Sequence, residues 1–201
     1  MSYPRPTTEQ MIERLAHLQR RRIPGRHWMA RAAVAAVLCD DADKGVSVLL
    51  MQRAIRDGDP WSGHMSFPGG RLDRNEDSVT AAIRETYEET GLELSTDDQV
   101  GSLSDVLTRR HERRLPMVVT PHVFVIDRFD QWQLNHEAES TLWVPLSFLA
   151  DRGNRRIMRW KAAGMTWKLS CYFYQEHRIW GLTLLMLREL LRVYRNQQPS
   201  G

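Results

Sequence analysis

The sequence predicts an α/β fold, in which apolar runs of strand length are interspersed with amphipathic helices. The runs at residues 30–39 and 117–126 are apolar and far shorter than a membrane span. Residues 79–90 carry small or apolar side chains at three- and four-residue steps, as on one face of a helix. A chain of 201 residues is long enough for one domain with a full core.

The first element predicted is an amphipathic helix over residues 7–22, which Pro24-Gly25 ends. We therefore divide the chain into an N-terminal helical extension, residues 1–28, and a main domain, residues 29–197. A basic amphipathic helix could also touch a membrane or serve as a targeting peptide, and the two glutamates in this segment weigh against both.

Two strands, residues 30–39 and 46–53, are predicted to pair as a β-hairpin around a short turn. Alanine is a poor strand former, so the first strand depends on its apolar context. A loop rich in glycine and proline follows, and residues 64–67 are predicted to form a short strand before the turn Pro68-Gly69-Gly70.

Residues 100–107 and 117–126 are predicted to be two further strands, joined by a basic loop. Residues 155–174 have the pattern of a hairpin, and residues 179–194 that of an apolar C-terminal helix. Aromatic side chains are more often packed than ligand-binding. We therefore expect three hairpin aromatics to pack in the core: Trp160, Trp167 and Tyr172.

Composition indicates a soluble globular protein, with 42% hydrophobic and 26% charged residues. The N-terminus lacks the apolar core of a secretory signal. Cys39 and Cys171 lie in strand-like runs and are expected to be small buried side chains, not a disulfide or a zinc site. We therefore expect a cytoplasmic location.

The net charge of +3 is compatible with an anionic small molecule and is weak support for a nucleic-acid partner. Arginines cluster in three places, at residues 20–22, 109–114 and 152–159. Each cluster is either a solvated surface or a contact for a phosphate group. Neither a membrane partner nor nucleic acid is expected, and the sequence is compatible with a homodimer.

The clearest chemical signal is a group of three carboxylates, Glu85, Glu88 and Glu89, on the predicted helix 79–90. Positions i, i+3 and i+4 share one helical face, so these like charges crowd together and destabilise an isolated helix. A solvated acidic face is one explanation. A bound divalent cation explains better why the helix carries this charge repulsion, because clustered carboxylates are the ligands of Mg²⁺ and Mn²⁺.

The stretch GRLDRNEDSVTAAIRETYEETGL, residues 70–92, resembles the Nudix box of the Nudix hydrolases. The glycines and charges stand at the spacing of that box, and Thr86 occupies a position that is usually aliphatic. The resemblance implies an α/β/α sandwich with a mixed sheet. It also implies an enzyme that uses Mg²⁺ or Mn²⁺ to hydrolyse a diphosphate linked to another group.

Carried over by position, the resemblance implies a metal site made of Glu85, Glu88, Glu89 and the backbone of Gly70. Arg84 would orient these carboxylates. Glu88 and Arg84 would thus belong to the catalytic machinery, with Glu76 as a supporting acid near the start of the helix.

Two segments resemble the coenzyme A pyrophosphatase branch of that family: the loop before the box, and the Ile-Trp-Gly-Leu-Thr opening of the C-terminal helix, residues 179–183. The loop departs from the branch at residues 57–61, which bears on the substrate and not on the chemistry. In that branch the loop is associated with recognition of coenzyme A. The residues it implies for substrate binding are Arg53, Arg56, Phe67, Gly69 and Arg71.

A late segment, residues 135–149, resembles the family's acidic residue followed by a Trp-Val-Pro-Leu strand and a short helix. Glu137 stands at the acidic position. The general base of Nudix enzymes lies either on the box helix or on a late loop. Glu137 is therefore a candidate base, with a structural role as the alternative.

The predicted reaction is hydrolysis of coenzyme A or an acyl-coenzyme A to 3′,5′-ADP and (acyl) phosphopantetheine. The alternative substrates are other nucleoside diphosphate derivatives, such as ADP-ribose or a dinucleoside polyphosphate. A non-catalytic module that binds nucleotide or RNA is a further alternative, and the intact glutamate set weighs against it.

Overall fold

The computed structural model describes residues 5–56, 61–108, 116–162 and 164–196. Within them the helices are α1 (Thr8–Ala16), α2 (Ser78–Thr90), α3 (Leu146–Ala150) and α4 (Gly181–Tyr194). The strands are β1 (Ala30–Asp41), β2 (Gly45–Arg53), β3 (Met65–Ser66), β4 (Gly69–Arg71), β5 (Gln99–Ser102), β6 (Val106–Thr108), β7 (Met117–Val125), β8 (Ala138–Pro145), β9 (Arg155–Ala162), β10 (Met165–Tyr174) and β11 (His177–Ile179).

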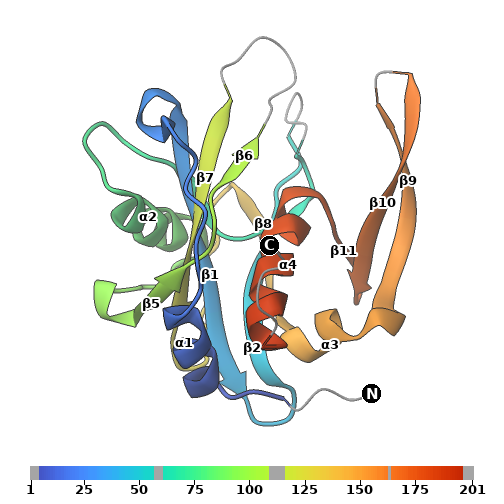
Figure 1. Cartoon of the computed structure of the whole chain (residues 1–201), viewed down its shortest axis with the longest axis horizontal. Coiled ribbons are helices and arrows are strands. Elements are labelled where there is room, and N and C mark those ends of the chain that lie inside the picture. Colours follow the sequence, from blue (N-terminus) through green and yellow to red (C-terminus); the bar gives the residue numbers. More distant parts are fainter. Residues whose placement is uncertain (1–4, 57–60, 109–115, 163, 197–201) are drawn as a thin grey trace.

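The described strands form a mixed main sheet and a small antiparallel sheet. In the main sheet the order is β3-β2-β1-β7-β5, with β4 paired to β1, β6 to β7 and β8 to β2. β1 and β7 run parallel, and the other pairs are antiparallel. The α/β class and the mixed sheet expected from the sequence are confirmed. β9, β10 and β11 form the small sheet, which lies beside α4 (Figure 1).

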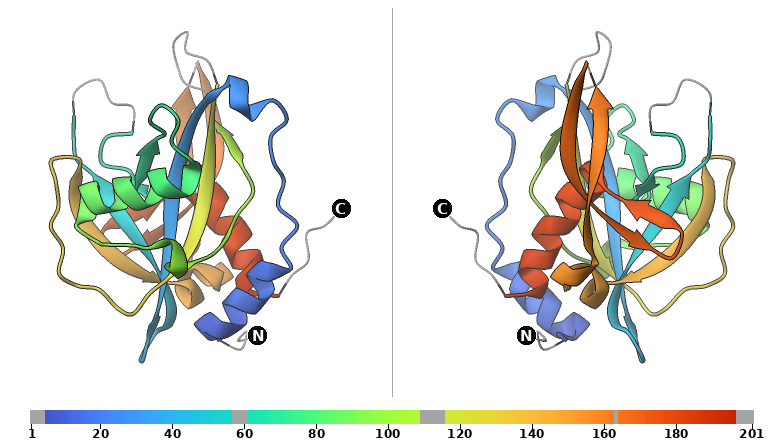
Figure 2. Two further views of the ribbon diagram at one scale, coloured as in Figure 1. Left: turned by 90° about the vertical axis from the view of Figure 1, so that its left-hand side faces the viewer. Right: turned by 90° about the vertical axis from the view of Figure 1, so that its right-hand side faces the viewer.

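Helices cover both faces of the main sheet. Alternate residues of its strands point to opposite sides, so each face has apolar side chains that a helix can bury. On one face Ala33, Ala35 and Val37 of β1 pack with Ala81 and Ala82 of α2. The other face packs against α1, α3 and α4, so the layers are those of an α/β/α sandwich. Figure 2 shows α2 on one side of the molecule and the small sheet on the other.

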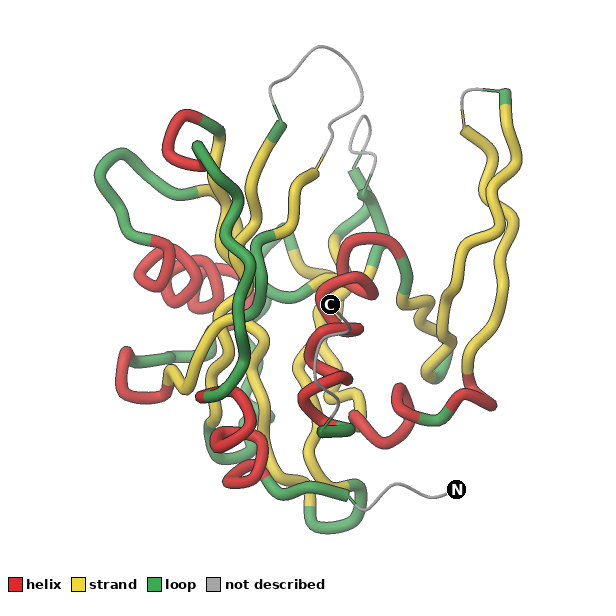
Figure 3. Tube along the Cα trace, viewed as in Figure 1, coloured by secondary structure: helices red, strands yellow, loops and turns green. Residues whose placement is uncertain are grey.

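β1 and β2 separate along their length, and this opens the place where the box begins. They pair only between Leu38 and Asp41 on β1. Further along, β1 pairs instead with β4, from Ala32 to Val34. The short strand β4 is therefore wedged between the diverging strands, and the chain runs from it into α2 (Figure 3).

The N-terminal helix is shorter than predicted, because α1 ends at Ala16 and the expected helix ran to residue 22. Thr7 caps it in a capping box with Gln10. Met11 is fully buried and Leu15 nearly so, both in the core shared with α4. The boundary at residue 28 stays a prediction, although the helix before it contributes to that core.

The predicted single strand over residues 100–107 is wrong, because it is divided into β5 and β6. The break at Leu103–Asp105 brings Asp105 to the N-terminal segment. Its carboxylate accepts hydrogen bonds from the backbone of Ile23 at 3.0 Å and from the side chains of Arg22 and Arg26. Burial would raise the pKa of this carboxyl, but these donors lower it.

Arg22, a member of the arginine cluster at residues 20–22, forms an ion pair of 2.9 Å with Asp105. This contact within the chain explains its position. The cluster at residues 109–114 lies outside the described residues, as do residues 57–60 of the loop before the box.

The hairpin over 155–174 is confirmed as β9 and β10, but its predicted packing is only partly right. Tyr172 is buried against Phe148, whereas the side chain of Trp167 is 48% exposed. The outer part of this hairpin stands away from the main sheet (Figure 1). Ile157, Met165 and Trp167 of this hairpin are 48–58% exposed, so within the described part of the chain no second layer covers these side chains.

Both cysteines are buried and unpaired, Cys39 in β1 and Cys171 in β10, as the sequence predicts. Burial raises the pKa of the Cys39 thiol to about 12. No helix in the described part of the chain is long and apolar enough to cross a membrane.

A buried histidine joins the start of α2 to the sheet. His122 on β7 lies with its Nδ1 3.0 Å from the side-chain nitrogen of Gln99, and with its Nε2 2.9 Å from Oγ of Ser78. Because the Gln99 amide donates to Nδ1, the proton of the neutral ring is on Nε2, where it donates to Ser78. Burial, with nearby Arg22, lowers the pKa of His122 to about 4.

We expect His122 to make folding sensitive to acid. Its pKa is lower in the folded chain, so the unfolded chain takes up the proton first and stability falls as pH drops from about 6.5 towards 4. Between pH 7 and pH 4.5 this one group should contribute a loss of about 2 kcal/mol. Urea unfolding of wild type and His122→Gln at both pH values measures it, and equal pH dependence in the two proteins would contradict it.

Candidate active site

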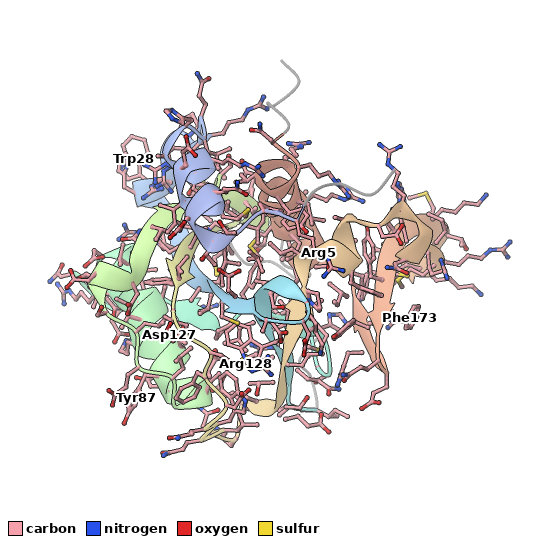
Figure 4. All side chains as sticks on the ribbon, turned by 90° about the horizontal axis from the view of Figure 1, so that it is seen from below. Arg5, Trp28, Tyr87, Asp127, Arg128 and Phe173 are labelled. Atoms are coloured by element: carbon pink, nitrogen blue, oxygen red, sulfur yellow. The ribbon has the colours of Figure 1, made fainter. Side chains whose placement is uncertain are left out.

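The box helix α2 begins and ends where the sequence predicts. The side chain of Asp77 accepts hydrogen bonds from the backbones of Val79 and Thr80 at 2.8 and 3.1 Å, and Gly91 is the C-cap with φ of 74°. Thr86, at the aliphatic position of the box, is fully buried and its hydroxyl donates to the Ala82 carbonyl. Tyr87 lies on the outer side of the helix, at the edge of the molecule (Figure 4).

Gly69 brings the β4 backbone directly against β1. Its φ is +142°, and a Cβ there would overlap the backbone of Ala33 and Val34. Only glycine fits this position without strain. The Gly69 N–H points to the helix and donates to the Glu89 carboxylate at 2.8 Å.

Glu89 is the buried member of the carboxylate group, with only 2% of its surface exposed. A solvated acidic face, one explanation of the carboxylate group, therefore does not hold for Glu89. Burial raises the pKa of this carboxyl to about 8; the Gly69 N–H opposes this shift, Glu85 adds to it, and Arg53 opposes it. A charged carboxylate at this depth needs a cation to offset the loss of water.

Arg84 holds the more exposed carboxylates in place. Its guanidinium donates to Glu76 at 2.9 and 3.0 Å, to Glu85 at 3.1 Å and to Glu88 at 3.3 Å. It also donates to the carbonyl of Arg71 at 3.2 Å. Hydrogen bonding to Arg84 lowers the pKa of Glu76, so this acid stays charged and keeps the guanidinium oriented.

Glu85 lies over the backbone of Gly70, where a Cβ would overlap its carboxyl group. Burial raises the pKa of Glu85, and Glu88 and Glu137 add to that effect. Residue 70 therefore has to be glycine for this carboxylate to rest where it does. The predicted contact between Gly70 and the glutamates has a steric basis.

The donor set fits a divalent cation of the hard, oxygen-binding type. Glu85 and Glu89 both have raised pKa values because they are buried close to other carboxylates, and the Gly70 backbone adjoins Glu85. In the described residues no group of three or more acidic, histidine or cysteine side chains forms a ready-made cage. Glu88, whose side chain is 51% exposed beside Arg84, is the carboxylate with room to turn towards a cation.

Glu137 comes to the same site from the loop before β8. Its charge acts on both Glu85 and Glu89, and its own carboxylate lies 3.6 Å from Arg56. The side chain is 37% exposed, so water can reach it. The structure thus brings the late acidic residue together with the box, as the resemblance implied.

Asn135 is a positioning residue that the sequence analysis did not identify. Its N–H donates to the carbonyl of Glu89 at 3.3 Å, and its side chain accepts from the N–H of Glu137 at 2.7 Å. An asparagine two residues before an acid is a signal for such a turn.

Of the residues predicted to bind substrate, Arg53, Arg56, Gly69 and Arg71 lie around the glutamates, and Phe67 does not present its side chain to them. Phe67 is 1% exposed and packs in the core with α4, so its side chain cannot contact a ligand. Large apolar side chains pack in the core by default, which explains this error. Arg56 also donates to the carbonyl of His136 at 3.1 Å.

Clustered carboxylates, oriented by an arginine, lie at the junction of a glycine-rich strand and a helix. This fold and these side chains define a hydrolytic site. Residues 29–161 match the family described as the NUDIX domain. The chain belongs to the Nudix family and is a pyrophosphohydrolase of that family, acting on phosphorus-containing anhydrides.

Two relatives and one solved structure illustrate this membership. The chain is 29% identical to mouse "Mitochondrial coenzyme A diphosphatase NUDT8" over 167 residues, 82% of this chain and 78% of that protein. It is 36% identical over 107 residues to "Uncharacterized protein C14C4.10c" of Schizosaccharomyces pombe, 51% of this chain and 32% of that protein. A MutT/nudix family protein from Enterococcus faecalis has the same fold, with TM-score 0.55 and 18% identity over 94% of this chain and 70% of that one.

A methyl group at residue 70 should disturb the carboxylates without unfolding the protein. Gly70→Ala displaces Glu85, which is a movable side chain, so we expect Mn²⁺ binding to weaken by roughly tenfold or more. Gly101→Ala is the matched control, because a Cβ there meets Leu15 at an ordinary 3.6 Å. Titration calorimetry with Mn²⁺ measures both, and equal affinities in the two variants would show that Gly70 has no such role.

Proposed function

We propose that this protein hydrolyses the diphosphate bond of coenzyme A or an acyl-coenzyme A, using Mg²⁺ or Mn²⁺. The products would be 3′,5′-ADP and (acyl) phosphopantetheine. The observation that carries the proposal is the convergence of Glu85, Glu89 and Glu137 beside Gly69 and Gly70.

In this proposal Glu85, Glu88 and Glu89 hold the cation, and the Gly70 backbone adjoins them. A divalent cation supplies neutralisation of the phosphate oxygens and makes a nearby water more acidic. Arg84 fixes the direction of Glu85 and Glu88, so that they are oriented before substrate arrives.

Glu137 is the proposed general base. It is accessible to water, and it lies among the charges of the same site. Its carboxylate lies 3.6 Å from the Arg56 guanidinium, within reach of a water from which it can accept a proton. Glu89 is less suited to this task, because its buried carboxyl has a pKa near 8 without a cation.

Two observations support coenzyme A as the substrate. One is the likeness to the mouse coenzyme A diphosphatase over 82% of this chain. The other is the placement of the upstream loop, since Arg53 and Arg56 lie on the side of the glutamates. These guanidinium groups suit the phosphates of such a substrate.

We expect Glu89→Gln to separate folding from catalysis. The amide can still accept from Gly69 and carries no charge to bury, so thermal stability should be unchanged or higher. Turnover should fall by roughly 10²-fold or more, because the cation loses a ligand. Glu93→Gln, the same change on an exposed residue, is the control. Substantial turnover in Glu89→Gln would remove the box from the mechanism.

A substrate panel tests the rest of the proposal. Coenzyme A, an acyl-coenzyme A, ADP-ribose and a dinucleoside polyphosphate are each incubated with Mg²⁺ and with Mn²⁺, and products are identified by mass. We expect fastest release of 3′,5′-ADP from the coenzyme A compounds. Faster cleavage of ADP-ribose would reject the substrate assignment, and tight binding without cleavage of any compound would identify a non-catalytic module.

A further inference from the structure

A cavity of about 280 Å³ lies between the β2–β3 region and the small sheet. Its walls include Gln52 and His64 from that region, Phe173 and Arg178 from the small sheet, and Trp180 at the start of α4. Phe173, on β10, is half exposed and lies on the opposite side of the molecule from Tyr87 of the box helix (Figure 4). The role of this cavity is not explained by the hydrolytic chemistry.

Aromatic and cationic groups are concentrated around Trp180. The ring of His64 lies edge-on to it with centroids 4.8 Å apart, and the Arg178 guanidinium carbon is 5.4 Å from the Trp180 ring centroid. A heteroaromatic base stacks favourably on such a surface, and a guanidinium stacked on the same ring adds to that attraction. The cavity is therefore suited to a nucleobase rather than to a flexible aliphatic chain.

Polar groups in the walls suit an adenine nucleotide. The side-chain oxygen of Gln52 accepts a hydrogen bond from Ser140 at 3.2 Å. This contact fixes the orientation of the Gln52 amide group. A glutamine amide pairs well with the N6 and N7 edge of adenine. Arg178 is exposed at the rim, where its guanidinium can bind a phosphate on the ribose.

The backbone of β2 connects this cavity to the glutamates. The N–H of Arg53 donates to the His64 carbonyl, and the Gly63 N–H donates to the Arg53 carbonyl, both at 3.0 Å. Gln52 lines the cavity, whereas the neighbouring Arg53 acts electrostatically on Glu89. Gln52 and Arg53 are successive residues of β2 and point to opposite faces, so one strand contributes a side chain to each site.

We propose that this cavity binds the adenine nucleotide end of the substrate, with Trp180 stacking on the base and Arg178 contacting the phosphate on the 3′ carbon of the ribose. The inference rests on the proposed function, which puts the diphosphate beside Glu85 and Glu89. It places recognition of the substrate's nucleotide on a surface made by β2, the small sheet and Trp180.

The test measures nucleotide binding without metal, so that it does not depend on turnover. Wild type is titrated calorimetrically with 3′,5′-ADP and with 5′-AMP. Arg178→Gln should weaken 3′,5′-ADP binding by about tenfold or more and 5′-AMP binding by less than about twofold, because only 3′,5′-ADP carries a phosphate on the 3′ carbon of the ribose. Arg159→Gln, the same change on exposed β9 outside the cavity, should leave both unchanged.

Trp180→Leu should weaken both nucleotides by about fivefold or more, and Trp180→Phe should restore most of the loss, because a phenyl ring still stacks. Trp180 also contacts Trp160 and His64, so thermal unfolding checks each variant. If Trp180→Leu does not fold, Gln52→Ala takes its place and should weaken both nucleotides.

Equal losses in Arg178→Gln and Arg159→Gln, or unchanged 5′-AMP binding in folded Trp180→Leu or in Gln52→Ala, would overturn the inference. Coenzyme A turnover by wild type is scored separately. If wild type cleaves coenzyme A but the cavity variants bind both nucleotides as wild type does, the cavity assignment is rejected and the proposed function stands. The expected binding pattern without coenzyme A cleavage supports the cavity and rejects the proposed function.

Discussion

The hydrogen bond from the Gly69 N–H to the Glu89 carboxylate is the contact on which the site depends. It joins β4 to the last turns of α2, and β4 in turn is paired with β1 between the diverging strands β1 and β2. Gly69 can make this contact only because it has no side chain to collide with Ala33 and Val34. The position of the box helix against β4 is therefore set by the backbone of Gly69 together with one carboxylate, that of Glu89.

Electrostatic cost is then distributed unevenly over the carboxylates. Arg84 offsets the charges of Glu76, Glu85 and Glu88 through direct hydrogen bonds. Glu89 lies beyond the reach of those bonds, is buried, and so has a raised pKa. The four acids are thus held in two ways: Glu76, Glu85 and Glu88 by the Arg84 guanidinium, and Glu89 by the Gly69 N–H.

The box helix and the pairing of β1 with β2 were predictable from sequence, because periodicity and tight turns act over a few residues. The gathering of Glu137 with the box came from resemblance, since the contact spans distant parts of the chain. Burial of Glu89 was missed because it depends on how β4, which carries Gly69, is wedged against β1. The break at Leu103–Asp105 was missed for a similar reason, since Asp105 is recruited by Arg22 and Arg26 from outside the strand.

The alternation of Gln52 and Arg53 on β2 has an evolutionary consequence. Gln52 lines the cavity beside Trp180, and Arg53 acts on Glu89 across the sheet. Mutations around the cavity can therefore accumulate without altering the carboxylates, because a sheet separates the two sets of side chains. Duplicated copies of such a chain can diverge in what they accept while inheriting the same bond-breaking apparatus.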